Sequence, residues 1–141
     1  MIKLVLYAVM LILAIPPVSI AKVKSNYQTI ARYDEHGKMV NIFNIFGLKN
    51  GAECTYLEMK GNITSVEYDK NKQITNFYIR TNLGYDENIY VTGLTLYKRL
   101  PADEVKKLPS LVFKGNTVQL QIYACGASGS HNEADQIAGL K

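Results

Sequence analysis

The chain has 141 residues, 48% of them hydrophobic, and its 16 basic and 12 acidic side chains give a formal net charge of +4. This length is enough for one domain with its own core and too short for two. The charge excess is small and no basic residues are clustered, so nucleic-acid binding, which needs a concentrated basic patch, is not expected.

The first 21 residues have the features of a secretory signal. Lys3 is their only charge, an apolar run follows from Leu4 to Ile15, and two prolines precede the small residues Ser19 and Ala21. This order is typical of an export signal cut after Ala21. The alternative is a retained membrane anchor, which needs about 20 apolar residues where this run has about a dozen. We therefore predict a soluble periplasmic or secreted protein that begins at Lys22 and has no membrane span.

Residues 22–50 form an N-terminal extension or an extra hairpin. Asp34 to Gly37 is a turn signal. The segment 39–46 after it contains Asn-Ile-Phe twice and fits either a strand, paired with 27–33, or an amphipathic helix. Residues 47–51 are expected to be a loop.

The main domain is predicted to span residues 51–141 and to start with a long bent strand, 54–69. Leu57, Met59, Gly61 and Ile63 alternate along one face, and after a slip in phase Val66 and Tyr68 continue that inward face. The slip and the glycine indicate a bulge or coil in the strand.

A polar turn at 69–72 leads to the second strand, 74–81, with Phe77 and Ile79 on one of its sides. A loop is expected at 82–88, with Asp86 and Glu87 at its solvated tip. Ile89 begins a short third strand that runs towards Leu96.

A helical segment is predicted after Pro101, which suits a first helical turn. Pro109 splits or kinks it into two short turns, and Lys114 to Asn116 end it. The fourth strand, 117–125, carries Val118, Leu120, Ile122 and Ala124 on one face. After a loop at 126–130, a last short strand covers 134–140 with Ile137 inward.

This order of elements is that of an OB architecture, a five-stranded Greek-key barrel with one short helix between its third and fourth strands. The chain thus resembles the small exported OB-fold proteins of bacteria, which include the B subunits of pentameric toxins. The resemblance covers residues 54–140 and implies a mainly β fold and a role in binding. The positions of the cysteines, on the first and fourth strands, depart from the disulfide placement of those B subunits.

Cys54 and Cys125 are the only cysteines. An even cysteine count in an exported chain favours a disulfide, and two cysteines permit a single intramolecular pairing. Zinc is not expected, because the chain has no C-x-x-C spacing and only His36 and His131 to add as ligands.

No catalytic residue, metal site or cofactor is predicted. His131 lies between Ser130 and Glu133, but these neighbours share one loop, whereas a functional triad is assembled from separate elements. Asp34 to His36 are more typical of a turn than of metal ligands, and Asn62, although part of a glycosylation sequon, falls within a predicted strand.

A ligand-binding face is predicted over the second and third strands, where OB barrels bind their ligands. Its candidate residues are Tyr78, Arg80, Tyr85, Asn88 and Tyr90. Tyrosine and arginine are frequent in binding hot spots, and the other interpretation is that these side chains pack the outer sheet or face solvent.

Two functions follow as hypotheses. The first is a non-enzymatic exported protein that binds a protein or a glycan of the bacterial envelope, such as an inhibitor or immunity protein. The alternative is the glycan-binding B subunit of a secreted oligomeric toxin. The native mass would separate them, because only the second requires a ring.

Overall fold

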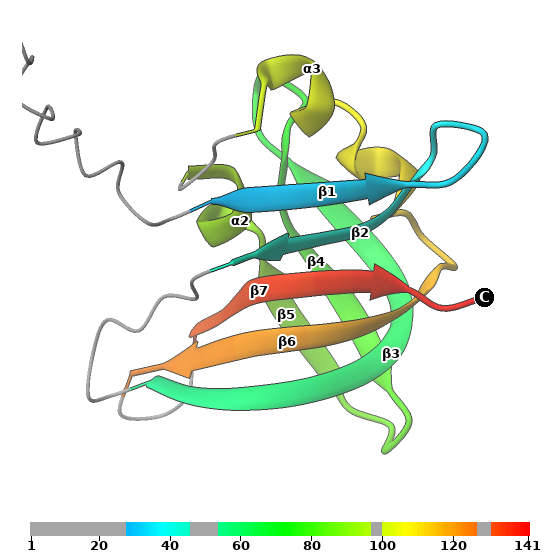
Figure 1. Ribbon diagram of the computed structural model, residues 1–141. Coiled ribbons are helices and arrows are strands. Elements are labelled where there is room, and N and C mark those ends of the chain that lie inside the picture. Colours follow the sequence, from blue (N-terminus) through cyan, green and yellow to red (C-terminus); the bar gives the residue numbers. More distant parts are fainter. Residues whose placement is uncertain (1–27, 46–53, 97–99, 127–130) are drawn as a thin grey trace, which may run out of the picture.

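The computed structural model describes residues 28–45, 54–96, 100–126 and 131–141. The predicted signal at 1–21 and the predicted loop at 47–51 lie outside these ranges, as does most of the loop predicted at 126–130. In the described part of the chain the fold is mainly β, as the sequence predicts (Figure 1).

Within the described ranges, seven strands form one sheet, and three short helical segments lie between β5 and β6. The strands are β1 (Thr29–Tyr33), β2 (Met39–Asn44), β3 (Cys54–Tyr68), β4 (Ile74–Thr81), β5 (Asp86–Tyr90), β6 (Thr117–Cys125) and β7 (His131–Gly139). The helical segments are α2 (Thr92–Leu96), α3 (Ala102–Val105) and the 3-10 turn η1 (Leu108–Ser110). α3 and η1 lie together at one end of the sheet (Figure 1).

Five of the strands pair in a ring, in the order β3, β4, β5, β7, β6 and back to β3. All of these pairings are antiparallel except the one between β5 and β7. The β3–β6 ladder runs from Cys54–Cys125 to Asn62–Thr117, whereas β5 and β7 share only the pairs Ile89–Asn132 and Tyr90–Glu133. The ring is therefore closed unevenly, with its thinnest joint between β5 and β7.

The N-terminal hairpin β1–β2 extends the sheet beyond the ring. β2 pairs with the second half of β7, from Phe43–Gln136 to Asn41–Ala138 (Figure 1). Of the two conformations open for residues 39–46, the strand is the one found, because β7 offers it a partner edge. The predicted turn is confirmed as well, since the Asp34 carboxylate accepts the backbone N–H groups of His36 and Lys38.

β3 is the long bent strand that its phase slip predicts. Its register with β4 shifts between Ile63 and Ser65, and at Gly61 it pairs with β4 on one side and β6 on the other. The inward orientation predicted for Leu57 and Tyr68 is wrong, since these side chains are 40% and 53% exposed. Both lie near the ends of β3, where it has a partner strand on one side only.

The third strand of the ring begins earlier and ends earlier than predicted. Gly84 takes a positive φ of 87°, which lets the chain turn within residues 82–85 and pair again from Asp86. The predicted continuation towards Leu96 is instead the helix α2. Gly93 is a poor helix former, and a tertiary contact orders this turn, because the buried Glu133 carboxylate accepts the Gly93 N–H.

The connection to β6 contains two short turns, α3 and η1, as expected. The break predicted at Pro109 is wrong: it falls at Lys106–Lys107, and Pro109 lies in the first turn of η1, where its missing N–H is not needed. Together with α2, the connection has three described helical segments where one short helix was predicted. The last of them ends at Ser110, before the predicted end at 114–116. β7 starts at His131 rather than Ala134, because its first residues pair with β5 and β6.

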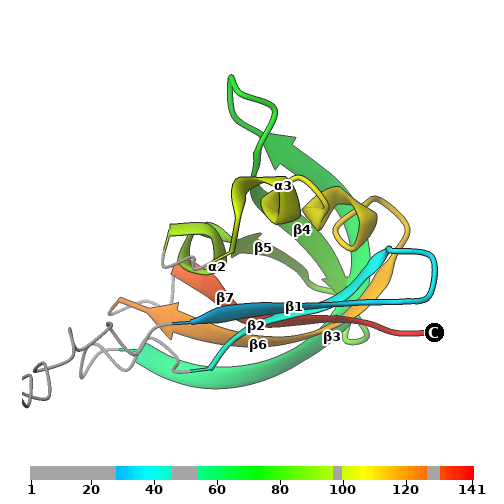
Figure 2. The same cartoon turned by 45° about the horizontal axis from the view of Figure 1, so that its top comes forward.

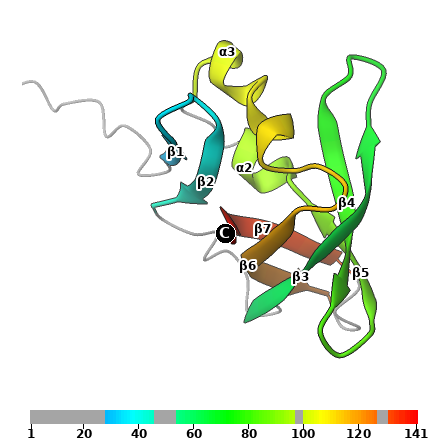
Figure 3. The same ribbon diagram turned by 90° about the vertical axis from the view of Figure 1, so that its right-hand side faces the viewer.

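The core is formed by buried side chains of the ring together with residues of β2, of α2 and of the segment from η1 to Val112. Figures 2 and 3 show the helical segments over one side of the sheet. Of the residues on the predicted inward faces, Ile63, Val118, Leu120, Ile122 and Ile137 are fully buried in the core. Met59 and Val66 pack against it partly buried, and Phe77 and Ile79 of β4 are fully buried in it. Burial of this apolar surface is the main favourable term in the stability of the fold. Among the described residues no helix has the length and apolarity to cross a membrane.

Candidate functional site

The outer face of the β4–β5 hairpin carries four of the five predicted ligand-binding residues. Tyr78 lies directly opposite Asn88, and Arg80 directly opposite Asp86. Tyr90 lies opposite Asn76. Side chains of directly opposed residues share a face, and the alternate residues Phe77, Ile79 and Ile89 are buried in the core.

The fifth predicted residue, Tyr85, lies apart from this face. It is in the turn between β4 and β5, 61% exposed, close in sequence to Leu83, which is 74% exposed. This turn projects from the sheet (Figure 3).

A row of hydrogen bonds crosses three strands on the outer face. The Asn76 side-chain amide donates to Glu67 Oε2 on β3 at 3.0 Å and to Asn88 Oδ1 on β5 at 2.8 Å. The Asn88 amide donates to the Tyr90 hydroxyl at 3.3 Å. Asn76 is 5% exposed, so both donors of its amide are satisfied and its orientation is fixed by its neighbours.

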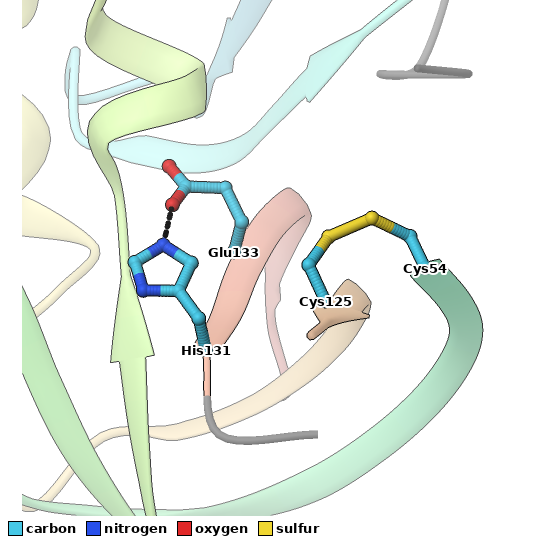
Figure 4. Close-up of a disulfide and its surroundings, with 4 residues drawn as sticks. All are labelled: Cys54, Cys125, His131 and Glu133. Atoms are coloured by element: carbon cyan, nitrogen blue, oxygen red, sulfur yellow. Dashed lines mark hydrogen bonds and ion pairs between the residues drawn. A yellow bond between two sulfur atoms is a disulfide. The ribbon is translucent and has the colours of Figure 1, made fainter. Parts of the chain in front are cut away.

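The row continues onto β7 through His131. The His131 ring stacks on the Tyr90 ring with centroids 4.4 Å apart, and His131 Nε2 lies 2.8 Å from Glu133 Oε2 (Figure 4). Because Glu133 also accepts the Gly93 N–H, this pair joins the face to the start of α2. His131 is thus the first residue of a strand and not part of the solvated loop predicted for it.

Arg80 and Asp86 close the other end of the face as a bidentate ion pair. Arg80 Nε lies 2.6 Å from Asp86 Oδ1, and a second hydrogen bond of 2.9 Å joins the guanidinium to Oδ2. The hydrogen bonds from Arg80 lower the pKa of Asp86, and those to Asp86 raise the pKa of Arg80. Asp86 and Glu87, predicted as a loop tip, are strand residues, and Glu87 accepts a hydrogen bond from Asn132.

Four residues of this site, Glu67, Asn76, His131 and Glu133, were missed by the sequence prediction. A strand that begins at His131 places His131 and Glu133 on one face, because residues two apart on a strand share a face. The sequence predicts this strand only from Ala134 and therefore leaves both residues in a loop.

The predicted disulfide is confirmed between Cys54 and Cys125, with an S–S distance of 2.04 Å. The two cysteines lie directly opposite each other on β3 and β6. Cys125 also pairs with His131 on β7, so the disulfide lies beside the His131 end of the face (Figure 4).

The other groups considered as sites have structural partners. The hydrogen bond from the Lys38 backbone lowers the pKa of Asp34 within its turn, and the Asn62 amide donates to the Gly115 carbonyl. Within the described ranges no three His, Cys, Asp or Glu residues are grouped so as to hold a metal ion.

Comparison with known proteins adds no relative. No protein-family model matches the chain, and neither the curated proteins nor the solved structures yield a match.

Proposed function

We propose that this chain is a non-enzymatic exported binding protein of the bacterial envelope, whose ligand, a protein or a glycan, contacts the outer face of the β4–β5 hairpin. The observation that carries this proposal is the hydrogen-bonded row from Glu67 through Asn76 and Asn88 to Tyr90, continued by the stack on His131. The row holds amide, phenol and imidazole groups in fixed positions at the surface. Such preorganisation reduces the entropy lost when a ligand binds.

We infer further that the ring of strands is an OB barrel. Its support is the order of the pairings, in which the third and fifth strands of the ring, β5 and β7, are parallel neighbours. The helical segments lie between the third and fourth strands, β5 and β6, as in that architecture. The proposed ligand face is then on the second and third strands of the barrel.

Export is proposed from the N-terminal sequence, and the disulfide is compatible with it. Disulfides persist in oxidising compartments such as the periplasm or the extracellular space. Mass spectrometry of the protein recovered from the periplasm or medium would test this proposal. A mature N-terminus at Lys22 is the expected result, and a chain retained in the cytosol with Met1 intact would contradict it.

The binding proposal is tested with variants on two faces. Tyr78→Ala and Asn88→Ala each remove a side chain from the proposed face. Tyr56→Ala is the control, because Tyr56 is a 46% exposed tyrosine that lies on the β3–β6 ladder and not on the β4–β5 hairpin. Each protein is screened on a glycan array and used to capture partners from envelope extract, after its melting temperature has been measured.

The expected result is a specific ligand that both face variants lose while Tyr56→Ala retains it. A ligand lost only by Tyr56→Ala would place binding on the other face and contradict the proposal.

A further inference from the structure

A cavity of about 230 Å³ lies at the helical end of the molecule, away from the proposed ligand face. Its lining residues come from the turn between β3 and β4, from α2, and from the segment from α3 to η1. These elements lie on the same side of the sheet (Figure 2). Its apolar wall contains Ile74, Val105 and Leu108, and its polar rim contains Asn71, Lys72 and Lys106. Its volume is below the roughly 300–1,000 Å³ typical of drug-sized ligands, so it suits a small one.

The turn that supplies Lys72 has an internal counterpart in the β1–β2 hairpin. In the β3–β4 turn, the Asp69 carboxylate accepts the N–H groups of Asn71 and Gln73. In the other turn the Asp34 carboxylate accepts the N–H groups two and four residues further on in the same way. The backbone bonds also match, since in each turn the first residue pairs with the fifth and accepts the N–H of the fourth.

The two turns differ at their fourth position, where the backbone is left-handed. Gly37 occupies it in the first turn, with a φ of 76°, and Lys72 in the second, with a φ of 61°. Among the described residues Lys72 is the only non-glycine residue with a positive φ. Glycine adopts this conformation without the steric cost that a Cβ brings, so Lys72 occupies a position that its counterpart turn fills with glycine.

The rim of the cavity is positively charged. Within the described part of the chain, neither Lys72 nor Lys106 has a carboxylate oxygen within the 4.0 Å of an ion pair. The acidic residues of α3, Asp103 and Glu104, act on Tyr33 of β1, where they add to the effect of burial in raising the pKa of the phenol. A cavity with an apolar wall and two rim lysines, neither ion-paired among the described residues, is complementary to an amphipathic anion.

We propose that this cavity binds a small amphipathic carboxylate, with its apolar body against Ile74 and Leu108 and its carboxylate between the rim lysines Lys72 and Lys106. This binding is separate from that at the β4–β5 face, because the cavity shares no lining residue with that face. The cavity brings residues 71–74 together with residues 105–109, so it is a property of the folded chain.

The test is a titration of the full chain with octanoate, followed by calorimetry and by backbone amide chemical shifts. Octanamide removes the charge of this probe, and acetate removes its apolar body. The variants are Lys72→Gly and Lys106→Gln, with Lys70→Gln as the matched control, because Lys70 is an exposed lysine of the same turn that does not line the cavity.

We expect octanoate to shift the amides of residues 71–74 and 105–108 and to bind more tightly than octanamide or acetate. Lys72→Gly and Lys106→Gln should each weaken octanoate binding by about two- to fivefold, the range for a solvated ion pair, and Lys70→Gln should not. Lys72→Gly should melt no lower than the wild type, because glycine relieves the left-handed backbone. Equal affinity for octanamide, equal weakening by Lys70→Gln, or shifts confined to other residues would each overturn the proposal.

Discussion

The ring of Tyr90 lies on the imidazole of His131, with centroids 4.4 Å apart and planes inclined by 20°. These residues belong to β5 and β7, the two strands with the shortest pairing in the ring. The stack and the contact of His131 with Glu133 therefore add side-chain interactions where backbone hydrogen bonds are fewest. Tyr90 is also one of the predicted ligand-binding residues, so the position of its side chain on that face depends on the contact between β5 and β7.

Replacing His131 by alanine is expected to loosen this joint. The stacked pair contributes about 0.5–1.5 kcal/mol beyond its buried area, and the loss of a partner for the buried Glu133 adds to the cost. We expect the free energy of unfolding to fall by about 1–2 kcal/mol in urea titrations, with faster hydrogen exchange at Tyr90 and Gly93. His36→Ala, in an exposed turn, is the control and should change neither quantity. Unchanged exchange at Gly93 in His131→Ala would contradict the role of the pair.

The disulfide is expected to supply a large share of the stability. Cys54 and Cys125 are 71 residues apart, and closing a loop of that length stabilises a fold by about 4 kcal/mol in the chain-entropy model. The double variant Cys54→Ala/Cys125→Ala, which leaves no unpaired thiol, should lose about this amount in chemical denaturation. Adding a reductant should lower the stability of the wild type to a similar value and leave the double variant unchanged. A double variant as stable as the wild type would contradict this role.

Much of the fold was predictable because alternation along a strand reports directly on burial. Val118, Leu120 and Ile122 on β6 alternate with polar residues, and the prolines Pro101 and Pro109 each lie at the start of one of the two short helical turns. The helix α2 was not predictable, because its Gly93 is ordered by a carboxylate 40 residues further on. Local propensity carries no information on such a contact.

The candidate site was predictable only in part. Tyr78, Arg80, Asn88 and Tyr90 follow from the hairpin pattern once the two strands are identified. His131 and Glu133 come from a strand that joins the site through tertiary pairing, and the start of that strand has no apolar alternation to reveal it. The link between Tyr90 and His131 therefore required the folded arrangement.

Gly61 is expected to tolerate no side chain. A Cβ at this position would lie 2.6 Å from the backbone carbonyl oxygen of Arg80, so β4 would have to move away from β3. Gly61→Ala should therefore lower the free energy of unfolding by about 1–3 kcal/mol, the usual cost of overpacking. Gly139→Ala is the matched control, because the nearest contact of its Cβ would be a Leu111 side-chain methyl at 3.3 Å and not a backbone atom. Equal losses in the two variants would show that the approach to the Arg80 carbonyl is not the cause.

Asp135 is expected to make stability depend on pH. It is 5% exposed, its carboxylate accepts a hydrogen bond from the Asn44 amide at 3.1 Å, and burial raises its pKa above the ordinary value of 3.8. The folded state then holds this proton more tightly than the unfolded state, so the contribution of Asp135 is fully present below pH 3.8 and is lost as the pH rises through the folded-state pKa. Asp135→Asn removes this titration and keeps an oxygen that can accept from Asn44.

Urea titrations across pH 3 to 7 measure this contribution. The free energy of unfolding of Asp135→Asn should match that of the wild type near pH 3, exceed it increasingly as the pH rises through the folded-state pKa of Asp135, and keep that excess at higher pH. Asp86→Asn is a control of opposite sign, because Arg80 lowers the pKa of Asp86. The wild type should have a higher free energy of unfolding than Asp86→Asn at pH 7, and this difference should be lost as the pH falls through the folded-state pKa of Asp86. Tyr56 and Tyr123, whose pKa values are raised by burial and by Asp135, stay protonated throughout this range and do not contribute. If the free energy of unfolding of the wild type instead rises relative to that of Asp135→Asn with increasing pH, the Asp135 carboxylate is stabilised as an anion and the prediction is wrong.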